Sequence, residues 1–268
     1  MISNLEQLNN QILYKEPLSI VRIGNVEVTS LLQQKGIYKQ MFTNAGFYGN
    51  EEIYKKWKNL YVQALMKSDC LLDVYTCRSF HITGDLIKLN LWKPTLPYVE
   101  DPKYWIELIK KIKEPIGIVS FFKADITRQI GKLNKIWDTT GLMKDFVIVK
   151  AYQTISGNEP HEHWFKTFIE LQKKIDKHPH IKVWFVSCGC YGLPLCDYLK
   201  NKGCRAIYVG GLLQLFFGLK GSRWDSRKDV TQYYNRHWVY PKEKPQNAEN
   251  VESGCYWGEE EKKKKSDS

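Results

Sequence analysis

The stretch KVWFVSCGCYGLPLCDYLKNKGCRAIYVGGLLQLFFGLKGSRW, residues Lys182 to Trp224, decides the fold. Its apolar run 183–187 has the length and residue types of a buried strand, and residues 193–202 follow a helical pattern that Gly203 ends. A second apolar run, 204–209, predicts another strand. We therefore expect one βαβ unit, in which the two strands are parallel.

Glycine-containing turns follow both strands of this unit. Gly189 and Gly192 come after the first strand, and Gly210 and Gly211 come after the second. Because ligands of open parallel sheets bind outside the carboxyl ends of the strands, the two turns should lie side by side at one edge. Glycine lets backbone approach a ligand closely and a helix N-terminus favours an anion, so the turns predict a cradle for a phosphate-bearing ligand. Tight turns need glycine in any case, which leaves a purely structural interpretation open.

The composition is typical of an intracellular globular protein. With 268 residues, 43% of them apolar, the chain fits one large α/β domain or two closely packed halves. Lys and Arg number 40 against 29 Asp and Glu, a net charge of +11 that suits sugar nucleotides, nucleic acid or an anionic membrane surface. No signal pattern opens the chain and no apolar run approaches the ~20 residues that span a bilayer. Because the seven cysteines are typical of reduced thiols, we expect a soluble, cytoplasmic protein.

Strand and helix patterns alternate along the rest of the chain. Strands are expected at 18–23, 70–74, 115–122 and 145–150, and helices at 5–13, 26–34, 51–67, 101–112, 123–137 and 162–177. Residues 81–99, with scattered prolines, are expected to form an irregular cover over a cleft. This alternation predicts an α/β, Rossmann-like, doubly wound sheet of at least five mainly parallel strands with helices on both faces.

The chain is expected to form a single domain, 1–257, with approximate halves 1–140 and 141–257. Residues 255–257 form a last apolar group that should dock the chain end onto the body. The remainder, 258–268, is dominated by charge and is expected to be disordered. Its lysine run 262–265 is compatible with a localisation signal or a nucleic-acid arm, but a solubilising tail is the commoner explanation of such a run.

The segment after the first expected strand, Arg22-Ile-Gly-Asn-Val-Glu27, holds the first candidate site residues. One interpretation places Asn25 at a helix N-cap and Glu27 in the first turn, where its charge favours the helix dipole. The alternative is that Arg22, Asn25 and Glu27 face a ligand and a divalent metal held by oxygen atoms. Spacing alone leaves both interpretations open.

Other polar and aromatic groups follow further strands. The loop 42–49 carries three aromatic residues and could stack a sugar or base ring, or merely pack on itself. Lys123, Arg128 and Gln129 come after the strand at 115–122, where exposure to solvent is the alternative interpretation. His161-Glu-His163 does not predict a metal site, because side chains two residues apart at a helix start point apart.

Taken together, these motifs resemble glycosyltransferases of the GT-D fold (DUF1792-like), of the type found in bacterial polysaccharide loci and in large DNA viruses. The resemblance covers about residues 18–257 and rests on the order and spacing of the motifs Arg22–Glu27, Asn44–Phe47, Ser120–Phe121 with Gln129, Ser187–Gly192, Gly210–Gln214, Phe217–Trp224, Glu243–Pro245 and Gly254–Trp257. It implies transfer of a sugar from a nucleotide-diphosphate donor, with UDP the expected nucleotide, to a hydroxyl of a glycan or glycoprotein acceptor. The host cytoplasm is the implied location if the chain is viral.

The resemblance also implies roles for individual residues. The family's Asp-x-Glu pair, linked to Mn²⁺ or Mg²⁺, falls on Asn25 and Glu27, and the loss of one carboxylate weakens the hold on a hard cation. Either a metal binds through Glu27 and the diphosphate of the donor, or a cationic side chain replaces it, for which Arg22, Lys123 and Arg128 are the candidates on charge grounds. Glu27, Asn25 and Arg22 are the catalytic candidates. The donor-binding candidates are Gly24, Asn44, Gly46, Ser120, Phe121, Gln129, Gly189, Tyr191, Gly192, Gly210, Gly211 and Gln214.

Two other classes of protein compete with this interpretation. An NAD(P)- or S-adenosylmethionine-dependent Rossmann enzyme would share the sheet, but no acidic residue ends the strand at 204–209 to hold a ribose. A nucleic-acid-binding protein would use the net charge of +11, but no basic and aromatic residues interleave on one sheet face. Nucleic acid is therefore the less expected partner.

Overall fold

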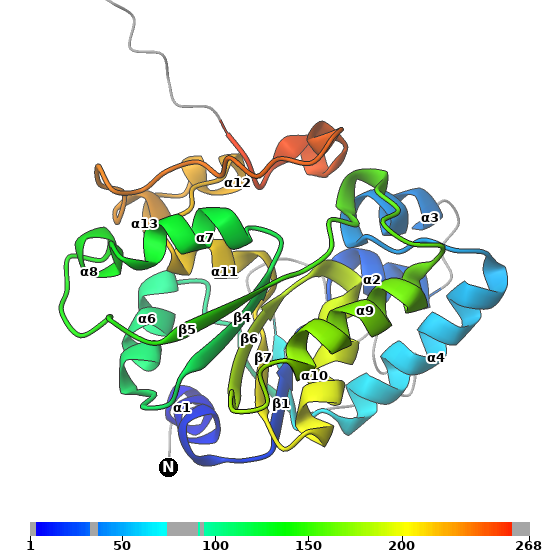
Figure 1. Ribbon diagram of the computed structural model, residues 1–268, viewed down its shortest axis with the longest axis horizontal. Helices are drawn as coiled ribbons and strands as arrows, with labels where there is room; N and C mark the ends of the chain where they lie inside the picture. Colours follow the sequence, from blue (N-terminus) through cyan, green and yellow to red (C-terminus); the bar gives the residue numbers. More distant parts are fainter. Residues whose placement is uncertain (1–3, 33–36, 74–90, 92–93, 259–268) are drawn as a thin grey trace, which may run out of the picture.

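The computed structural model describes residues 4–32, 37–73, 91 and 94–258 (Figure 1). Most of the cover expected at 81–99 and all but the first residue of the tail expected at 258–268 lie outside the described residues. Of the helices that the structure describes, none is both long and apolar enough to cross a bilayer.

One parallel sheet of seven strands runs through the molecule in the order β3-β2-β1-β7-β6-β4-β5. The strands are β1 (Leu18–Val21), β2 (Cys70–Asp73), β3 (Thr95–Pro97), β4 (Ile116–Ser120), β5 (Phe146–Lys150), β6 (Val183–Ser187) and β7 (Arg205–Tyr208). Every pairing between neighbours is parallel, so the carboxyl ends of all seven strands point to the same edge. The expected α/β class with a doubly wound parallel sheet is confirmed.

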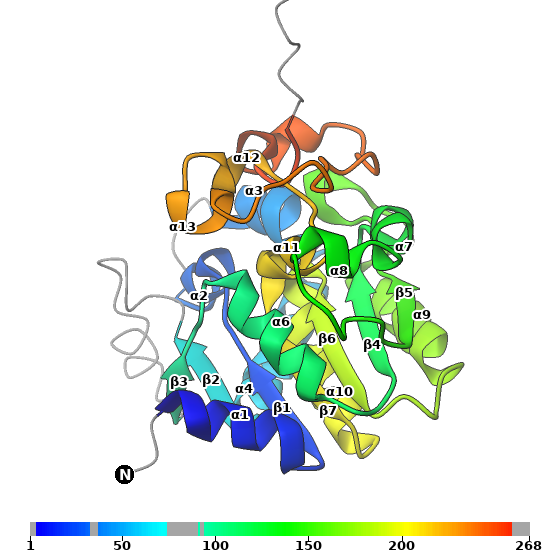
Figure 2. The same ribbon diagram turned by 90° about the vertical axis from the view of Figure 1, so that its left-hand side faces the viewer.

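Helices cover both faces of this sheet (Figures 1 and 2). One face carries α4, α9 and α10, and the other carries α1, α6 and α11. The described helices are α1 (Asn4–Tyr14), α2 (Asn25–Leu31), α3 (Ile37–Gln40), α4 (Glu51–Lys67), α6 (Pro102–Lys111), α7 (Lys123–Ile130), α8 (Leu133–Ile136), α9 (Trp164–Asp176), α10 (Gly192–Asn201), α11 (Leu213–Phe216), α12 (Ser222–Asp225) and α13 (Lys228–Thr231). A π-helical segment, η1 (Met41–Ala45), and the short 3₁₀ segments η2 (Ile155–Gly157), η3 (Gly189–Tyr191), η4 (Gly210–Leu212), η5 (Ala248–Asn250) and η6 (Glu252–Gly254) connect them.

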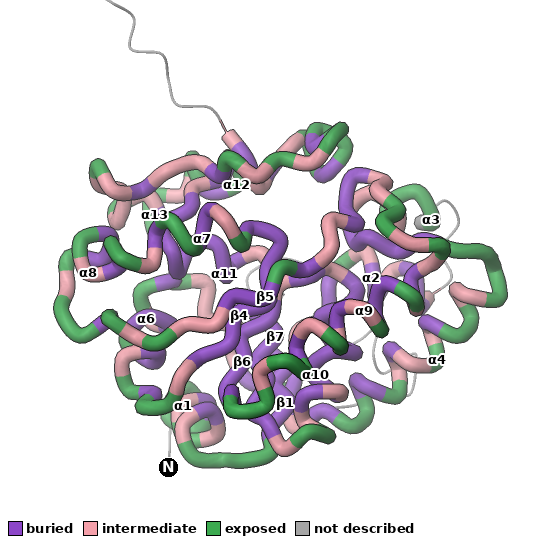
Figure 3. The backbone as a smooth tube through the Cα atoms, viewed as in Figure 1, coloured by how far each residue is buried: buried purple, intermediate pink, exposed green. Residues whose placement is uncertain are grey.

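The central strands are apolar without alternation because both of their faces are covered. All residues of β1, β4 and β7 are buried, whereas the edge strands β3 and β5 also contain intermediate and exposed residues (Figure 3). Gly117 of β4 makes room for a large neighbour, because a Cβ there would lie 2.2 Å from the Trp184 ring of β6. Close packing of this kind supplies the hydrophobic stabilisation of the fold.

The structure differs from two expectations about single elements. The helix expected at 123–137 is two helices, α7 and α8, separated where Gly131 ends the first. Residues 95–97, expected to be irregular, form the edge strand β3, which pairs with β2. Pro97 ends β3, where a residue that cannot donate a ladder hydrogen bond is tolerated.

The chain end from α12 onwards lies across the carboxyl edge of the sheet (Figure 1). The expected docking of residues 255–257 is confirmed: Trp257 is buried and its ring packs against Phe122, 5.9 Å between centroids. The indole Nε1 of Trp257 also donates to the carbonyl oxygen of Glu243, 2.9 Å away. We call residues 221–257 the C-terminal strap.

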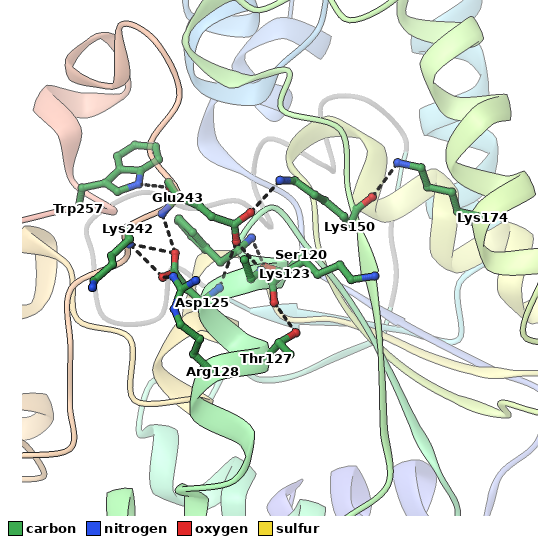
Figure 4. Close-up of polar contacts among 12 residues, drawn as sticks. Ser120, Lys123, Asp125, Thr127, Arg128, Lys150, Lys174, Lys242, Glu243 and Trp257 are labelled. Atoms are coloured by element: carbon green, nitrogen blue, oxygen red, sulfur yellow. Dashed lines mark hydrogen bonds and ion pairs between the residues drawn. The ribbon is translucent and has the colours of Figure 1, made fainter.

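A reciprocal pair of carboxylates attaches this strap to the body (Figure 4). Asp125, buried in the first turn of α7, accepts hydrogen bonds from the backbone N–H groups of Lys242 and Glu243 at 3.0 and 2.8 Å. Glu243 in return accepts from the N–H groups of Ala124 and Asp125 at 2.6 and 3.2 Å, at the helix N-terminus. Lys150 of β5 completes the cluster with an ion pair to Glu243 at 2.7 Å. Each carboxylate thus accepts hydrogen bonds from backbone N–H groups of the other segment. The N-terminus of a helix favours negative charge, which stabilises both carboxylates at the start of α7.

We expect Asp125→Ala to lower the free energy of unfolding by about 3 kcal/mol, because buried N–H groups of the strap lose a charged acceptor. Urea unfolding followed by circular dichroism measures this. Asp145→Ala, at an exposed aspartate before β5, is the matched control and should change stability by no more than about 0.5 kcal/mol. Equal stability of the two variants would contradict the role of Asp125 as an anchor.

Candidate functional site

A cavity of about 1040 Å³ lies at the carboxyl edge of the sheet, beneath the C-terminal strap. Its floor comes from the segments that follow β1, β4, β6 and β7, and its other walls come from η1, from residues 98–100 and from the strap. A volume of this order holds a ligand the size of a nucleotide sugar. Binding at this edge is the general rule for open parallel sheets.

The first wall is the segment between β1 and α2. Gly24, not Asn25, is the N-cap residue of α2, so the expected N-cap role of Asn25 is wrong. The reason is the side chain of Glu27, which folds back over the helix start. A Cβ on Gly24 would lie only 2.0 Å from the Glu27 carboxylate, so no side chain fits there. Asn25 is left exposed as the first helical residue.

Glu27 lines the cavity although it is buried, with 5% of its surface exposed. Burial raises the pKa of its carboxyl group, and the nearby Arg22 guanidinium opposes that rise. The Glu252 carboxylate of the strap raises the pKa further. A carboxyl group with a raised pKa next to a cation is suited to exchange a proton with a bound ligand.

Arg22 is placed by two tyrosine rings and by a glycine. Its guanidinium carbon lies 5.9 Å from the centroid of Tyr98 and 5.8 Å from that of Tyr208. The backbone of Gly210 allows the closest approach, since a Cβ there would lie 2.1 Å from Nη1 of Arg22. Cation–π contacts of this kind hold a positive charge in a defined position at the cavity wall.

The glycine turns, expected to cradle a phosphate, allow other groups of the protein to approach their Cα atoms closely. A Cβ on Gly211 would lie 2.5 Å from Cε1 of the Tyr256 ring, and a Cβ on Gly210 would meet Arg22. A Cβ on Gly189 would likewise lie 2.4 Å from the carbonyl oxygen of Ala45. These three glycines therefore make room for groups of the protein itself and also line the cavity.

The C-terminal strap forms the opposite wall with Arg223, Glu252 and Tyr256. Nη1 of Arg223 donates to the Tyr256 hydroxyl at 3.2 Å, Nη2 pairs with the Glu252 carboxylate, and the guanidinium lies 4.8 Å from the centroid of the Tyr256 ring. Three consecutive residues at this rim, Glu252, Ser253 and Gly254, have positive φ angles of 45°, 58° and 75°. Left-handed backbone at non-glycine residues costs free energy and is found most often at functional sites.

The remaining charges of the cavity are balanced. Arg227 pairs with Glu100 at 2.7 Å and also with Asp229. The charged residues of the lining are Arg22, Lys39, Arg223 and Arg227 against Glu27, Glu100, Glu249 and Glu252. Equal numbers of both signs indicate a site that recognises a charged group at a defined position and not a uniformly basic groove.

The described residues do not fit a divalent metal. No three His, Cys, Asp or Glu side chains among them gather closely enough to hold one. Asn25 is exposed whereas Glu27 is buried, and the guanidinium of Arg22 acts on the Glu27 carboxylate. Of the other acidic residues in the lining, Glu100 and Glu252 already pair with arginines. A hard cation needs several oxygen ligands, which this wall does not supply.

Ten of the predicted site residues line the cavity: Arg22, Gly24, Asn25, Glu27, Asn44, Phe121, Gly189, Gly210, Gly211 and Gln214. The amide nitrogen of Gln214 donates to three backbone carbonyls, the shortest contact being 2.8 Å to Lys220, so this end of the side chain holds the strap. The side-chain oxygen of Gln214, Oε1, has no hydrogen-bond partner among the described residues.

Five predicted residues lie outside the lining: Gly46, Ser120, Gln129, Tyr191 and Gly192. Tyr191 is buried in a stack with Trp164, 4.7 Å between centroids. Gln129 is also buried and donates to the carbonyl of His237 at 2.8 Å. Ser120 accepts from the N–H of Phe122 at 3.2 Å. Gly46 and Gly192 leave room for other side chains, since a Cβ would lie 2.4 Å from the Thr154 hydroxyl and from the Tyr208 ring respectively.

Lys123 and Arg128, the other two cations considered in place of a metal, do not line the cavity. Arg128 pairs with Asp125 at the strap anchor, and Lys123 is exposed at the first turn of α7. Of the three cations considered from sequence, Arg22 alone lies in the lining.

Several lining residues were not predicted: Tyr98, Glu100, Arg223, Arg227, Glu252 and Tyr256. Most of them belong to the C-terminal strap, which the Asp125–Glu243 contact, together with the contacts of Gln214 and Trp257, docks across the sheet edge. The signal in the sequence was a cluster of aromatic and arginine residues after the last strand, 223–257, in a region with little strand or helix pattern.

Comparisons with known proteins find a fold likeness alone. Neither a scan against protein-family models nor a search of curated proteins gives a match. Among solved structures, the chain is similar to a glycosyltransferase (DUF1792) from Streptococcus sanguinis, at 14% identity over 88% of this chain and 97% of that one, with a TM-score of 0.48. Two further structures of domain of unknown function 1792, one described as having a distinct glycosyltransferase fold, are similar at 14% identity and the same TM-score over 91% of their chains. These belong to the fold family that the sequence motifs resemble, and at this distance the likeness concerns the course of the backbone.

The raised pKa of Glu27 predicts how Glu27→Gln changes stability with pH. The folded chain binds this proton more tightly than the unfolded chain, whose carboxyl titrates near the ordinary value of 4.5, so ionising Glu27 costs folding free energy. That cost is absent well below the ordinary pKa and complete above the raised one. Glu27→Gln should therefore gain stability relative to the wild type as pH rises above the ordinary value of 4.5 and through the raised pKa, measured as thermal unfolding midpoints. A difference that shrinks with rising pH would contradict the assignment.

Proposed function

We propose that the chain is a glycosyltransferase that transfers a sugar from a nucleotide-diphosphate donor, with UDP the first nucleotide to test, to a hydroxyl of a glycan or glycoprotein. One observation carries the proposal. The Glu27 carboxyl group and the Arg22 guanidinium, both from the segment after β1, lie in a single large cavity at the carboxyl edge of a parallel sheet. An acid–base group beside a cation is what transfer from a diphosphate requires.

The aromatic residues of the cavity suit the uncharged parts of such a donor. The rings of Tyr98, Tyr208 and Tyr256 all line the cavity and are held in place by partners. Tyr98 donates to the carbonyl of Val209 and Tyr208 to that of Gly189, each at 2.9 Å. Rigid rings at a cavity wall give a base or a sugar a flat apolar surface at low entropic cost. They replace Tyr191, which packs in the core, as the aromatic candidates.

The proposed reaction uses Glu27 as the base. The oxygen of the acceptor hydroxyl forms a bond to the anomeric carbon of the donor sugar, and the hydroxyl proton passes to the Glu27 carboxylate. The bond from that carbon to the β-phosphate oxygen breaks, and its electron pair stays on the nucleoside diphosphate. The leaving group thus gains negative charge, which cations at the cavity wall stabilise.

Binding of nucleic acid is not favoured by the cavity. Four basic and four acidic residues line it, whereas a phosphate-backbone groove carries a clear excess of positive charge. The net charge of +11 is in part contributed by the four lysines at 262–265, which lie outside the described residues.

Release of nucleotide from a panel of UDP-, GDP- and TDP-sugars, with sugar acceptors, tests the proposal. We expect turnover with one donor, and Glu27→Gln should lower the rate on the order of 100-fold or more, because general acid–base catalysis contributes about that much. The affinity of the variant for the donor should stay within a few-fold of the wild type.

Glu162→Gln provides the matched control, since Glu162 is exposed outside the cavity lining. It should turn over like the wild type. Wild-type turnover in Glu27→Gln would remove Glu27 from the mechanism, and no binding of any nucleotide sugar by the wild type would overturn the proposed function.

A further inference from the structure

A transferase of this kind has to neutralise the negative charge that develops on the leaving diphosphate. The described residues hold no cluster of acidic or imidazole ligands for a divalent cation. At Gly210 and Gly211 the space that a Cβ would fill is occupied by Arg22 and by Tyr256. Arg223 lies over the Tyr256 ring, so two positively charged side chains of the cavity meet these neighbouring glycines, one directly and one through that ring.

Arg22 and Arg223 approach the cavity from opposite walls. Arg22 follows β1, and Arg223 belongs to the strap in α12, about 200 residues later in the chain. Burial raises the pKa of the Tyr98 hydroxyl to about 12, and both arginines oppose that rise, so both act on the same phenol. The Tyr256 ring, which lies on Gly211, feels both charges as well.

Both guanidinium groups are held in fixed orientations. Arg22 lies between the rings of Tyr98 and Tyr208 and against Gly210. Arg223 lies over the ring of Tyr256, and 33% of its side chain remains exposed. Preorganised guanidinium groups give short, paired hydrogen bonds to phosphate oxygens, which makes arginine better suited than lysine to this geometry.

One of these guanidinium groups already forms an ion pair with a carboxylate of the protein. Glu252 pairs with Nη2 of Arg223, and 44% of the Glu252 side chain is exposed. A carboxylate and a phosphate present oxygen atoms to a guanidinium in the same planar fashion. The pair therefore shows that Arg223 accepts an oxyanion at the cavity wall, and Glu252 would compete with a bound phosphate.

We propose that Arg22 and Arg223 form a binding site for the diphosphate of the donor and take the place of a divalent cation. The inference rests on the proposed function for the identity of the ligand, whereas the site itself is defined by its affinity for a pyrophosphate group. Glu252 modulates the site by engaging Arg223 while the ligand is absent. Closure of the strap is part of the site, because Arg223 reaches the cavity only from the docked strap.

Isothermal titration of the full chain with inorganic pyrophosphate and with UDP, in EDTA and separately in MnCl₂, tests the inference. We expect both ligands to bind in EDTA, with affinities that MnCl₂ does not improve. Arg22→Met and Arg223→Met should each weaken binding about tenfold or more, since a charge-assisted hydrogen bond contributes at least that much. Arg236→Met removes an exposed arginine of the same strap that lies outside the lining, and it should bind like the wild type.

Two further variants separate an anion-binding role from a structural one. Glu252→Gln breaks the same ion pair as Arg223→Met, so a merely structural pair predicts equal losses of affinity. The proposed site instead predicts opposite effects, with tighter pyrophosphate binding in Glu252→Gln because the competing charge is removed. Arg22→Lys keeps the charge if Arg22→Met fails to fold, and it should retain part of the affinity, with circular dichroism reporting the fold.

The outcomes distinguish this inference from the proposed function. Pyrophosphate that binds only in MnCl₂, or with equal affinity to Arg223→Met and the wild type, overturns the arginine site and leaves the transferase proposal standing. No binding of pyrophosphate in either buffer also overturns the site. Arginine-dependent binding of pyrophosphate without binding of UDP supports the site and overturns UDP as the donor nucleotide.

Discussion

The site depends on the reciprocal contact between Asp125 and Glu243. Each carboxylate accepts backbone N–H groups of the other segment, so the start of α7 and the middle of the C-terminal strap are joined by charge-assisted hydrogen bonds on both sides. The strap has few regular elements of its own and could not keep its place by local structure. Docked in this way, it brings Arg223 and Tyr256 over the carboxyl edge of the sheet and turns an open edge into a walled cavity.

The sequence predicted the parts of the fold that local pattern controls. Continuous apolar runs marked β4, β6 and β7, because strands covered on both faces have no polar side to alternate with. The strand β3 escaped prediction, since a three-residue edge strand that ends in proline carries almost no periodic signal. Gly131 divided a single expected helix into α7 and α8, an outcome that the apolar spacing alone did not reveal.

The candidate site was predicted in part, and the limit is physical. Arg22, Glu27 and the turn glycines followed from the rule that parallel strands deliver their carboxyl ends to one edge. That rule states which positions gather there, but not which way each side chain points. Gly210 and Gly211 showed that something approaches the backbone closely, and only the structure identifies the approaching groups as Arg22 and Tyr256. The docking of residues 255–257 was predicted, but the strap residues that line the cavity were not assigned to the site, because their position depends on contacts between residues far apart in the chain, such as Asp125 and Glu243, 118 residues apart.

The two walls of the cavity come from opposite ends of the chain, and this has a consequence for biosynthesis. All seven strands of the sheet are complete once residue 208 has been made, yet the strap residues up to Trp257 are still missing at that stage. A nascent chain on the ribosome can therefore form its sheet before the strap side of the cavity has been synthesised. The full wall of the cavity, with Arg223 and Tyr256, becomes available to a ligand only after the strap has been made and docked.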